Sequence, residues 1–263
     1  MIRINGLESF YQLEGQGDPV VLLHGWGASS QSLAGVAACL VPTFRVVSVD
    51  LPGFGWSQAP PAAWGTADYA DHIRQLLEEI RIEKAALLGH SFGGRIAIQL
   101  ASCHPERVAR LILVASAGVR PKRGPRYYVR VTTVKALRRL LTLPGMEGVG
   151  NRLLSRWQAK VGSRDYLAAG RLRPTLVKVV NEDLTPALVL VQAPTLLVWG
   201  DQDQEVRRPA METMAGRIPR ARLKVFVGAG HFPFQDAPEA FCQAAKEFLQ
   251  AERWAETAAG EGR

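Results

Sequence analysis

The sequence lacks the features of a disulfide-rich, membrane-spanning or disordered protein. It holds only three cysteines in 263 residues, Cys39, Cys103 and Cys242, which are widely spaced and have no histidine cluster near them. Such spacing predicts neither a disulfide framework nor a zinc site. No apolar run approaches the roughly 20 residues of a membrane span, and the polar, glycine-broken residues 1–15 are not typical of a signal peptide. We therefore expect a soluble protein of a reducing compartment, the cytoplasm.

Positive charge is plentiful, but it is concentrated in one central segment. Residues 119–186 hold 15 of the 32 Lys and Arg and 4 of the 24 Asp and Glu, so the rest of the chain has a net charge of −3. A basic stripe can indicate nucleic-acid binding. Here the charges lie on helical patterns without a binding motif, so a solvated helical face is the simpler interpretation and no nucleic-acid partner is expected. A sharper alternative is a segment whose arginines favour anionic substrates.

Short apolar runs alternate along the chain with amphipathic helical patterns. Near-continuous runs rich in β-branched residues are typical of parallel strands that are covered on both faces. Thr66 and Pro238 open two helical patterns with apolar residues at helical spacing. This alternation predicts the α/β class, with a doubly wound, mostly parallel central sheet. The expected strands begin at Pro19, Phe44, Ala85, Val108, Ala193 and Ala221.

The strand–helix rhythm stops in the basic segment. Residues 118–186 contain helical patterns and Pro or Gly stops, but no convincing strand. We interpret them as a basic helical cap inserted after the sixth core strand. The predicted core is then formed by residues 1–117 and 187–263.

The strongest local signal is the stretch Gly89-His90-Ser91-Phe92-Gly93, which follows an apolar strand and precedes a helical pattern. A G-x-S-x-G sequence in that context is typical of a nucleophile elbow. The turn is so tight that side chains at Gly89 and Gly93 would clash. Ser91 is thereby expected at the carboxyl end of the sheet and at a helix N-terminus, which favours developing negative charge.

A serine nucleophile needs a base, and the chain has five histidines. His231 is the best candidate, because it follows the last strand in a glycine-hinged loop on the same edge of the sheet as the elbow. His72 and His104 are expected at the surface. His24 is expected to brace its loop, and His90 belongs to the elbow itself.

The base in turn needs an acid to orient its ring. Asp201 and Asp203 both follow the strand T-L-L-V-W-G, and the residues alone leave both as candidates. Their place between the serine and the last histidine gives the chain order Ser, Asp, His. Asp50 comes before the elbow, which favours a structural role in fixing its own Gly/Pro loop.

The loop His24–Gly27 is the candidate for the fourth part, an oxyanion hole. The backbone N–H of Phe92 directly follows the nucleophile, and the N–H of Trp26 is the natural second donor. Gly25 and Gly27 let that backbone approach a carbonyl oxygen closely. One such donor contributes roughly 3 kcal/mol to lowering a barrier.

Five motifs occur in a characteristic order between Val20 and Leu249. They are H-G-W-G, D-L-P-G-F-G-W-S, G-H-S-F-G-G, W-G-D-Q-D and G-A-G-H-F-P, and together they resemble the α/β-hydrolase superfamily. In that family the acid is usually the Asp three residues after the strand-end glycine, which implies Asp203, with Asp201 as the second choice. The resemblance implies neither a metal ion nor an organic cofactor.

Some branches of that superfamily fit less well. Haloalkane dehalogenases and epoxide hydrolases have a nucleophilic Asp where this chain has Ser91. Carbon–carbon hydrolases of ring-fission products typically have Asn before the serine and Trp after the histidine, where His90 and Phe232 stand here. The H-G-W-G loop is similar to that of the small pimeloyl-ester carboxylesterases.

The first hypothesis is a serine carboxylesterase for small to medium acyl esters. Ser91 attacks the ester, His231 takes its proton and Asp203 orients the ring, while the N–H groups of Trp26 and Phe92 hold the oxyanion. The expected partner is a small-molecule ester, and esters that bear a carboxylate are expected to be favoured over neutral ones. The chain is compatible with a monomer or a homodimer.

Two alternatives remain open. One is a carbon–carbon bond hydrolase of 2-hydroxy-6-oxo dienoates, whose acidic substrates would suit the basic cap. The other is a non-catalytic relative that only binds a ligand, which a broken triad would have favoured. Four aromatic side chains of the cap either line the pocket or pack against the core: Tyr127, Tyr128, Trp157 and Tyr166.

Overall fold

The computed structural model describes residues 1–120, 132–133 and 164–251. By their internal contacts the residues form two compact units. The first, called the core here, is made of residues 1–120 and 174–263. The second, called the insertion, is residues 121–173. Its described part holds helix α6 (Arg164–Ala168) and the 3-10 turn η3 (Gly170–Leu172).

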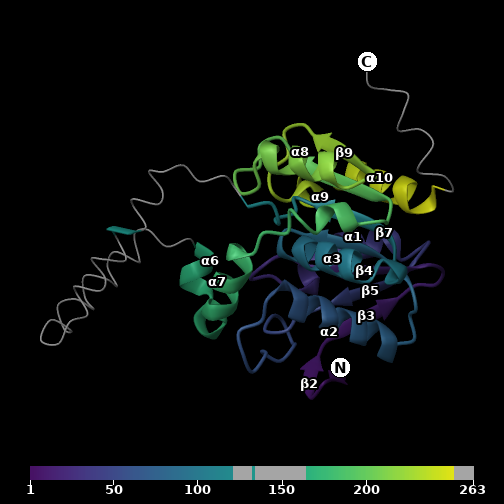
Figure 1. Cartoon of the computed structure of the whole chain (residues 1–263). Coiled ribbons are helices and arrows are strands. Elements are labelled where there is room, and N and C mark those ends of the chain that lie inside the picture. Colours follow the sequence, from purple (N-terminus) through teal and green to yellow (C-terminus); the bar gives the residue numbers. More distant parts are fainter. Residues whose placement is uncertain (121–131, 134–163, 252–263) are drawn as a thin grey trace, which may run out of the picture. The chain divides into compact units, whose positions relative to one another are not determined.

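A seven-stranded sheet forms the centre of the core, in the order β3-β5-β4-β6-β7-β8-β9 (Figure 1). The edge strand β3 is antiparallel to β5, and every other neighbouring pair is parallel. The six predicted strands are all present, which confirms the predicted fold class. The strands are β3 (Tyr11–Glu14), β4 (Pro19–Leu23), β5 (Arg45–Val49), β6 (Ala85–His90), β7 (Val108–Val114), β8 (Thr195–Gly200) and β9 (Ala221–Phe226).

A separate hairpin precedes the sheet. Strands β1 (Ile2–Ile4) and β2 (Leu7–Ser9) pair antiparallel through a two-residue turn at Asn5 and Gly6. Both turn residues have positive φ, 47° and 81°, the backbone that an Asn-Gly hairpin turn requires. The sequence analysis did not predict this hairpin, because three-residue strands are too short to show a period.

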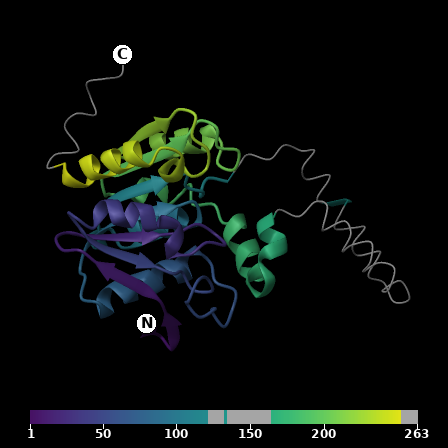
Figure 2. The same cartoon turned by 180° about the vertical axis from the view of Figure 1, so that it is seen from behind.

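Helices cover both faces of the sheet. Helices α2 (Thr66–Glu79) and α3 (Phe92–Cys103) pack together on the face seen in Figure 1. Helices α1 (Ala34–Leu40) and α10 (Pro238–Gln250) pack together on the face seen in Figure 2. The remaining helical elements are η1 (Ser30–Leu33), η2 (Pro105–Arg107), α7 (Arg173–Asn181), η4 (Leu188–Leu190), α8 (Arg208–Arg217) and α9 (Pro233–Asp236).

The core residues follow the pattern that the sequence predicts. In α2, Tyr69, Ile73, Leu76 and Leu77 are fully buried. Alternate residues of the central strands, such as Leu22, join the side chains of α1 and α10 in one apolar cluster. Burial of these apolar surfaces is the main stabilising contribution to the fold.

The insertion differs in its bounds from the predicted cap, 118–186. The described contacts assign residues 118–120 and 174–186 to the core. The carboxylate of Glu182 accepts hydrogen bonds from the N–H and hydroxyl of Thr66 at the start of α2, and Lys178 pairs with Asp68. Before the insertion, five strands belong to the central sheet, and two more, β1 and β2, form the separate hairpin, which gives seven strands in all. The sequence predicted six core strands before the insertion.

The expectation of unpaired cysteines is wrong. Cys39 on α1 and Cys242 on α10 form a disulfide, with Cα atoms 6.1 Å apart, whereas Cys103 is free and exposed. The two residues are separated by 203 positions in the chain, and only the packing of α1 against α10 brings them together. The expectation of a reducing compartment loses this support. Within the described residues, no helix is long and apolar enough to cross a membrane.

Candidate active site

The backbone at Ser91 has the strained geometry of a tight strand-to-helix turn. Ser91 lies between β6 and α3 with φ 50° and ψ −105°, a region that costs a non-glycine residue free energy. A side chain at Gly89 would meet the carbonyl of Gly93 at 2.5 Å, and one at Gly93 would meet the carbonyl of Leu23. Both glycines are therefore required by space, and the half-buried Ser91 is presented at the start of α3.

The loop after β4 lies against this turn. A side chain at Gly25 would approach the Cβ atom of Ser91 to 3.6 Å. The Trp26 ring packs edge-on against the ring of Phe92, with centroids 5.3 Å apart. Gly27 has φ 73°, which a side chain would strain. Among the described residues, the N–H groups of Trp26 and Phe92 have no hydrogen-bond acceptor, so both can donate to a ligand.

An acid and a base meet at the other side of the turn. Nδ1 of His231 donates to Oδ2 of Asp203 at 2.9 Å. The second oxygen of Asp203 accepts the N–H groups of Glu205 and Val206 at 2.8 and 3.0 Å. Burial acts to raise the pKa of Asp203, but the hydrogen bonds from His231 and the two backbone groups outweigh it and hold the pKa below its usual range. Asp203 is thus a carboxylate suited to orient the ring.

Asp201 has a different task from Asp203. Its Oδ1 atom accepts the N–H of Gly228 at 2.7 Å. That bond fixes the loop after β9 at a position three residues before His231. The geometry therefore distinguishes the two candidates that the residues alone left open.

His90 connects the elbow to the histidine loop. Its Nε2 atom donates to the carbonyl oxygen of His231 at 2.9 Å, and the two rings lie 4.9 Å apart. Burial, followed by the nearby His231 ring, lowers the pKa of His90 to about 4. His90 is therefore neutral near pH 7. The sequence analysis assigned His90 only to the elbow, since a contact between residues 141 positions apart has no local signal.

The other histidines behave in two ways. His24 is fully buried, donates through Nδ1 to the Gly25 carbonyl and accepts the N–H of Leu51 at Nε2, so it braces its loop as expected. The expectation that His72 lies at the surface is wrong. His72 is 3% exposed and bonds the hydroxyl of Ser9 at 2.8 Å, because hairpin β1–β2 covers its side of α2.

Asp50 has the structural role that its place in the chain favours. Its carboxylate accepts the N–H groups of Ser30 and Trp56 at 2.7 and 2.9 Å. His104 is half-buried, and its Nδ1 atom lies 3.5 Å from the carboxylate of Glu106. Neither Asp50 nor His104 is bonded to the residues around Ser91.

The residue that the sequence analysis missed is Glu205. Its Oε2 atom lies 3.3 Å from Nε2 of His231, the nitrogen that does not face Asp203. Among the described residues, no hydrogen bond joins Ser91 Oγ to His231 in this structure. The position two residues after Asp203 is the signal that points to Glu205, since a short turn brings such a residue back toward the same ring.

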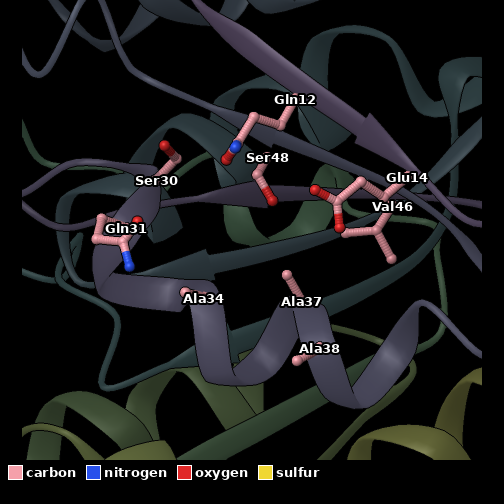
Figure 3. Close-up of a pocket in the computed structure, with 9 residues that line it drawn as sticks. All are labelled: Gln12, Glu14, Ser30, Gln31, Ala34, Ala37, Ala38, Val46 and Ser48. Carbon is pink, nitrogen blue, oxygen red and sulfur yellow. The ribbon is translucent and has the colours of Figure 1, made fainter.

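Cavities also occur away from this site. A cavity of about 160 Å³ lies between α1 and strands β3 and β5 (Figure 3). It stays open because α1 presents alanines there, including Ala34 and Ala37, beneath the side chains of Gln12 and Glu14. A second, of about 530 Å³, lies between hairpin β1–β2 and α2 and includes Trp64. The residues that line either cavity include none of the three triad candidates.

Two further predictions concern a metal site and the aromatic side chains of the cap. The described residues contain no group of three or more His, Cys, Asp or Glu that could hold a metal ion. Of the four aromatic residues expected to line or pack the cap, Tyr127, Tyr128 and Trp157 lie outside the described residues. Tyr166 lies on α6, where the Arg173 guanidinium sits 4.9 Å from its ring.

Comparison with known proteins places the chain among hydrolases. Residues 18–238 match the model of the family described as alpha/beta hydrolase fold. A pimeloyl-[acyl-carrier protein] methyl ester esterase of Aeromonas hydrophila is 33% identical over 89% of this chain and 96% of its own. A 2-hydroxymuconate semialdehyde hydrolase of Pseudomonas sp. strain CF600 is 31% identical over 93% of this chain and 91% of its own.

A solved structure has the same backbone fold. An esterase from Exiguobacterium antarcticum superposes with a TM-score of 0.74 and is 26% identical. The match covers 95% of this chain and 98% of the esterase. These relatives include esterases and a hydrolase of 2-hydroxymuconate semialdehyde, so they support hydrolysis in general rather than one substrate.

Proposed function

Since the chain belongs to the alpha/beta hydrolase fold family, we propose that it is a serine hydrolase that cleaves carboxylic esters of small to medium acyl chains. The observation that carries the proposal is that the proposed nucleophile and the proposed acid–base pair lie at the same edge of the sheet. The strained Ser91 stands at the start of α3, and the hydrogen-bonded pair of His231 and Asp203 stands beside the same turn. The esterases among the relatives support this substrate class.

The proposed reaction uses each group for one task. Ser91 Oγ attacks the ester carbonyl carbon while Nε2 of His231 takes its proton, and Asp203 stabilises the imidazolium. The N–H groups of Trp26 and Phe92 hold the oxyanion. His231 then returns the proton to the leaving alcohol, which gives an acyl-enzyme. Water, activated by His231, releases the acid and restores Ser91.

The basic segment extends the proposal to the charge of the substrate. Residues 119–186 hold 15 Lys and Arg against 4 Asp and Glu. Such a segment favours esters that bear a carboxylate, and the preference is expected to weaken as salt screens it. Equal kcat/KM at low salt for a dicarboxylate monoester and its neutral isostere would contradict this extension.

A second candidate function is hydrolysis of a carbon–carbon bond in 2-hydroxy-6-oxo dienoates. It is supported by the 31% identity to a 2-hydroxymuconate semialdehyde hydrolase. His90 and Phe232 are the residues that argue against it, because ring-fission-product hydrolases typically have Asn and Trp there. A broken acid–base pair would have favoured a protein that binds such ligands without turnover, and the 2.9 Å bond between His231 and Asp203 argues against that role.

One substrate panel tests these candidates together. The wild type and Ser91→Ala are assayed on p-nitrophenyl acetate, butyrate, octanoate and palmitate, and on a 2-hydroxy-6-oxo dienoate. We expect turnover that falls with acyl length and drops at least about a thousandfold in Ser91→Ala. Turnover of the dienoate alone would favour the carbon–carbon hydrolase. No turnover of any substrate by folded protein would favour the ligand-binding role.

A further inference from the structure

A second carboxylate, besides that of Asp203, lies beside the ring of the proposed base, at its Nε2 atom. Oε2 of Glu205 lies 3.3 Å from Nε2 of His231, and the Glu205 side chain is 65% exposed while that of His231 is 9% exposed. The backbone of Glu205 is fixed to the same cluster, because its N–H donates to Asp203. Glu205 therefore brackets the acid–base pair, with its charge on the side that faces the substrate.

Among the described residues, no cationic Lys or Arg side chain is paired with the Glu205 carboxylate. In the form of His231 that can act as a base, Nδ1 carries the hydrogen that Asp203 accepts, so Nε2 presents a lone pair and cannot donate to Glu205. Within residues 1–120 and 164–251, no Lys or Arg nitrogen lies within 4.0 Å of the Glu205 carboxylate. Its sequence neighbour Arg208 pairs with Glu212 instead, at 2.8 Å.

The Glu205 carboxylate lies near the place that the leaving alcohol of an ester takes in the proposed reaction. During acylation Nε2 of His231 donates its proton to the leaving oxygen, at a hydrogen-bond distance of about 3 Å. The leaving oxygen and Oε2 of Glu205 are then neighbours of the same nitrogen, within about 6 Å of each other by that distance and the 3.3 Å contact. The carbonyl oxygen is held elsewhere, by the N–H groups of Trp26 and Phe92.

We propose that Glu205 is a specificity-determining residue that favours esters whose alcohol half carries a positive charge and disfavours those whose alcohol half is anionic. The inference rests on the proposed esterase function. Ser91, His231 and Asp203 keep their roles, and Glu205 decides which leaving group they accept. An alkylammonium group a few bonds from the ester oxygen has the chemistry that this carboxylate recognises.

The inference concerns only the alcohol half of the substrate, so it is compatible with a carboxylate on the acyl half. An ammonium group attached a few bonds from the leaving oxygen can approach the carboxylate to a similar distance, and opposite charges about 6 Å apart at a partly exposed site attract enough to change kcat/KM about tenfold. Because the Glu205 side chain is 65% exposed, salt should screen much of that effect.

The test compares two esters of the same shape. Butyrylcholine carries a quaternary nitrogen where 3,3-dimethylbutyl butyrate carries a carbon, and acid release measures kcat/KM for both. The ratio of the two values within one variant cancels any general loss of activity. The variants are Glu205→Gln and Glu205→Lys, with Glu212→Gln as the matched control, because Glu212 is an exposed carboxylate paired to Arg208.

We expect the wild-type ratio of cationic to neutral ester to fall about tenfold in Glu205→Gln and further in Glu205→Lys, and to stay unchanged in Glu212→Gln. The difference in this ratio between the wild type and Glu205→Gln should become smaller in 0.5 M salt. An equal ratio in the wild type and Glu205→Gln, with both proteins active on p-nitrophenyl butyrate, would overturn the role of Glu205 and leave the esterase function standing. No hydrolysis of any ester would overturn both.

Discussion

At the scale of single residues, the turn after β8 separates two aspartates that are two positions apart. Asp203 is 5% exposed and bonds His231, whereas Asp201 bonds the N–H of Gly228 in the loop after β9. One turn thus supports the proposed base in two ways. The first acts on the ring itself, and the second acts on the backbone that leads to it.

Substituting the two aspartates separately should show this division. Asp203→Asn keeps the size of the side chain but favours the wrong ring tautomer of His231, so we expect kcat to fall about 10³- to 10⁴-fold. Asp201→Asn keeps an oxygen for Gly228 and should lower kcat less than about fivefold. Steady-state kinetics on p-nitrophenyl butyrate checks both. Similar losses in the two variants would contradict the assignment of Asp203.

The sequence predicted the residues that local rules require, but not those that meet across the fold. Ser91 and its glycines were predictable because the tight turn constrains neighbouring positions, and Asp50 because it ends a strand beside a Gly/Pro loop. The bond of His90 to His231 and the position of Glu205 depend on how the loops after β6, β8 and β9 meet. For His90 no pattern within one segment carries that information, and for Glu205 the local signal is limited to its place two residues after Asp203.

At the scale of elements, the same distinction explains which strands and helices were predictable. Long buried strands such as β6 and the amphipathic α2 have a clear period, and they lie where the sequence predicts. Hairpin β1–β2 is too short for a period and was missed, and with it the burial of His72. The return from the insertion was assigned to the cap because its contacts with α2 span more than 100 residues.

That return segment stabilises the start of α2. The two carboxylate oxygens of Glu182 share the single N–H of Thr66, at 3.2 and 3.1 Å, and one of them also accepts the Thr66 hydroxyl at 2.6 Å, next to the positive end of the helix dipole. Glu182→Ala leaves those donors without the carboxylate, so we expect a loss of about 1–2 kcal/mol in the free energy of unfolding. Urea unfolding measures it.

The control for Glu182 is Glu212→Ala, which removes only an exposed pair with Arg208 on α8. It should change the free energy of unfolding by less than about 0.5 kcal/mol. Equal effects of the two substitutions would mean that the carboxylate of Glu182 does not cap α2.

Burial of His72 under the hairpin predicts a dependence of stability on pH. Burial lowers the pKa of His72 to about 4, so between pH 6.5 and 4 the unfolded chain binds a proton that the folded chain does not. The stability that the neutral His72 contributes is therefore complete above pH 6.5. It is lost as the pH falls toward 4, which lowers the free energy of unfolding by up to about 3 kcal/mol.

Replacing His72 by Gln should remove that part of the pH dependence. Urea unfolding at pH 7 and pH 4.5 gives the loss of stability on acidification for each protein. We expect a smaller loss in His72→Gln than in the wild type, since Gln can bond Ser9 without titrating. His90, whose pKa is also lowered to about 4, keeps its own contribution in both proteins. Identical losses would contradict a buried neutral His72.

At the scale of the whole molecule, charge and covalent structure divide the chain differently. The basic excess lies in residues 119–186, mostly in the insertion, while the triad candidates and Glu205 belong to the core. The disulfide lies on the face of α1 and α10 and joins residues near opposite ends of the core. The proposed selectivity of Glu205 therefore belongs to the core, whereas most of the basic excess belongs to the insertion.

The disulfide should raise the stability of the core by restricting the unfolded chain. Cys39 and Cys242 close a loop of 203 residues, for which loop-closure entropy gives a stabilisation of roughly 5 kcal/mol at most. For a domain of this size that corresponds to a fall in Tm of about 10 °C on reduction. Thermal unfolding with and without dithiothreitol measures this fall in Tm.

Cys39→Ala should lower the Tm as reduction does, and Cys103→Ser should leave the Tm and its response to reduction unchanged, because Cys103 is free. Thiol titration of the unfolded, unreduced protein should detect one thiol per chain. Three thiols, with a Tm indifferent to dithiothreitol, would contradict the bond between α1 and α10 and would restore the reducing compartment that the three widely spaced cysteines first suggested.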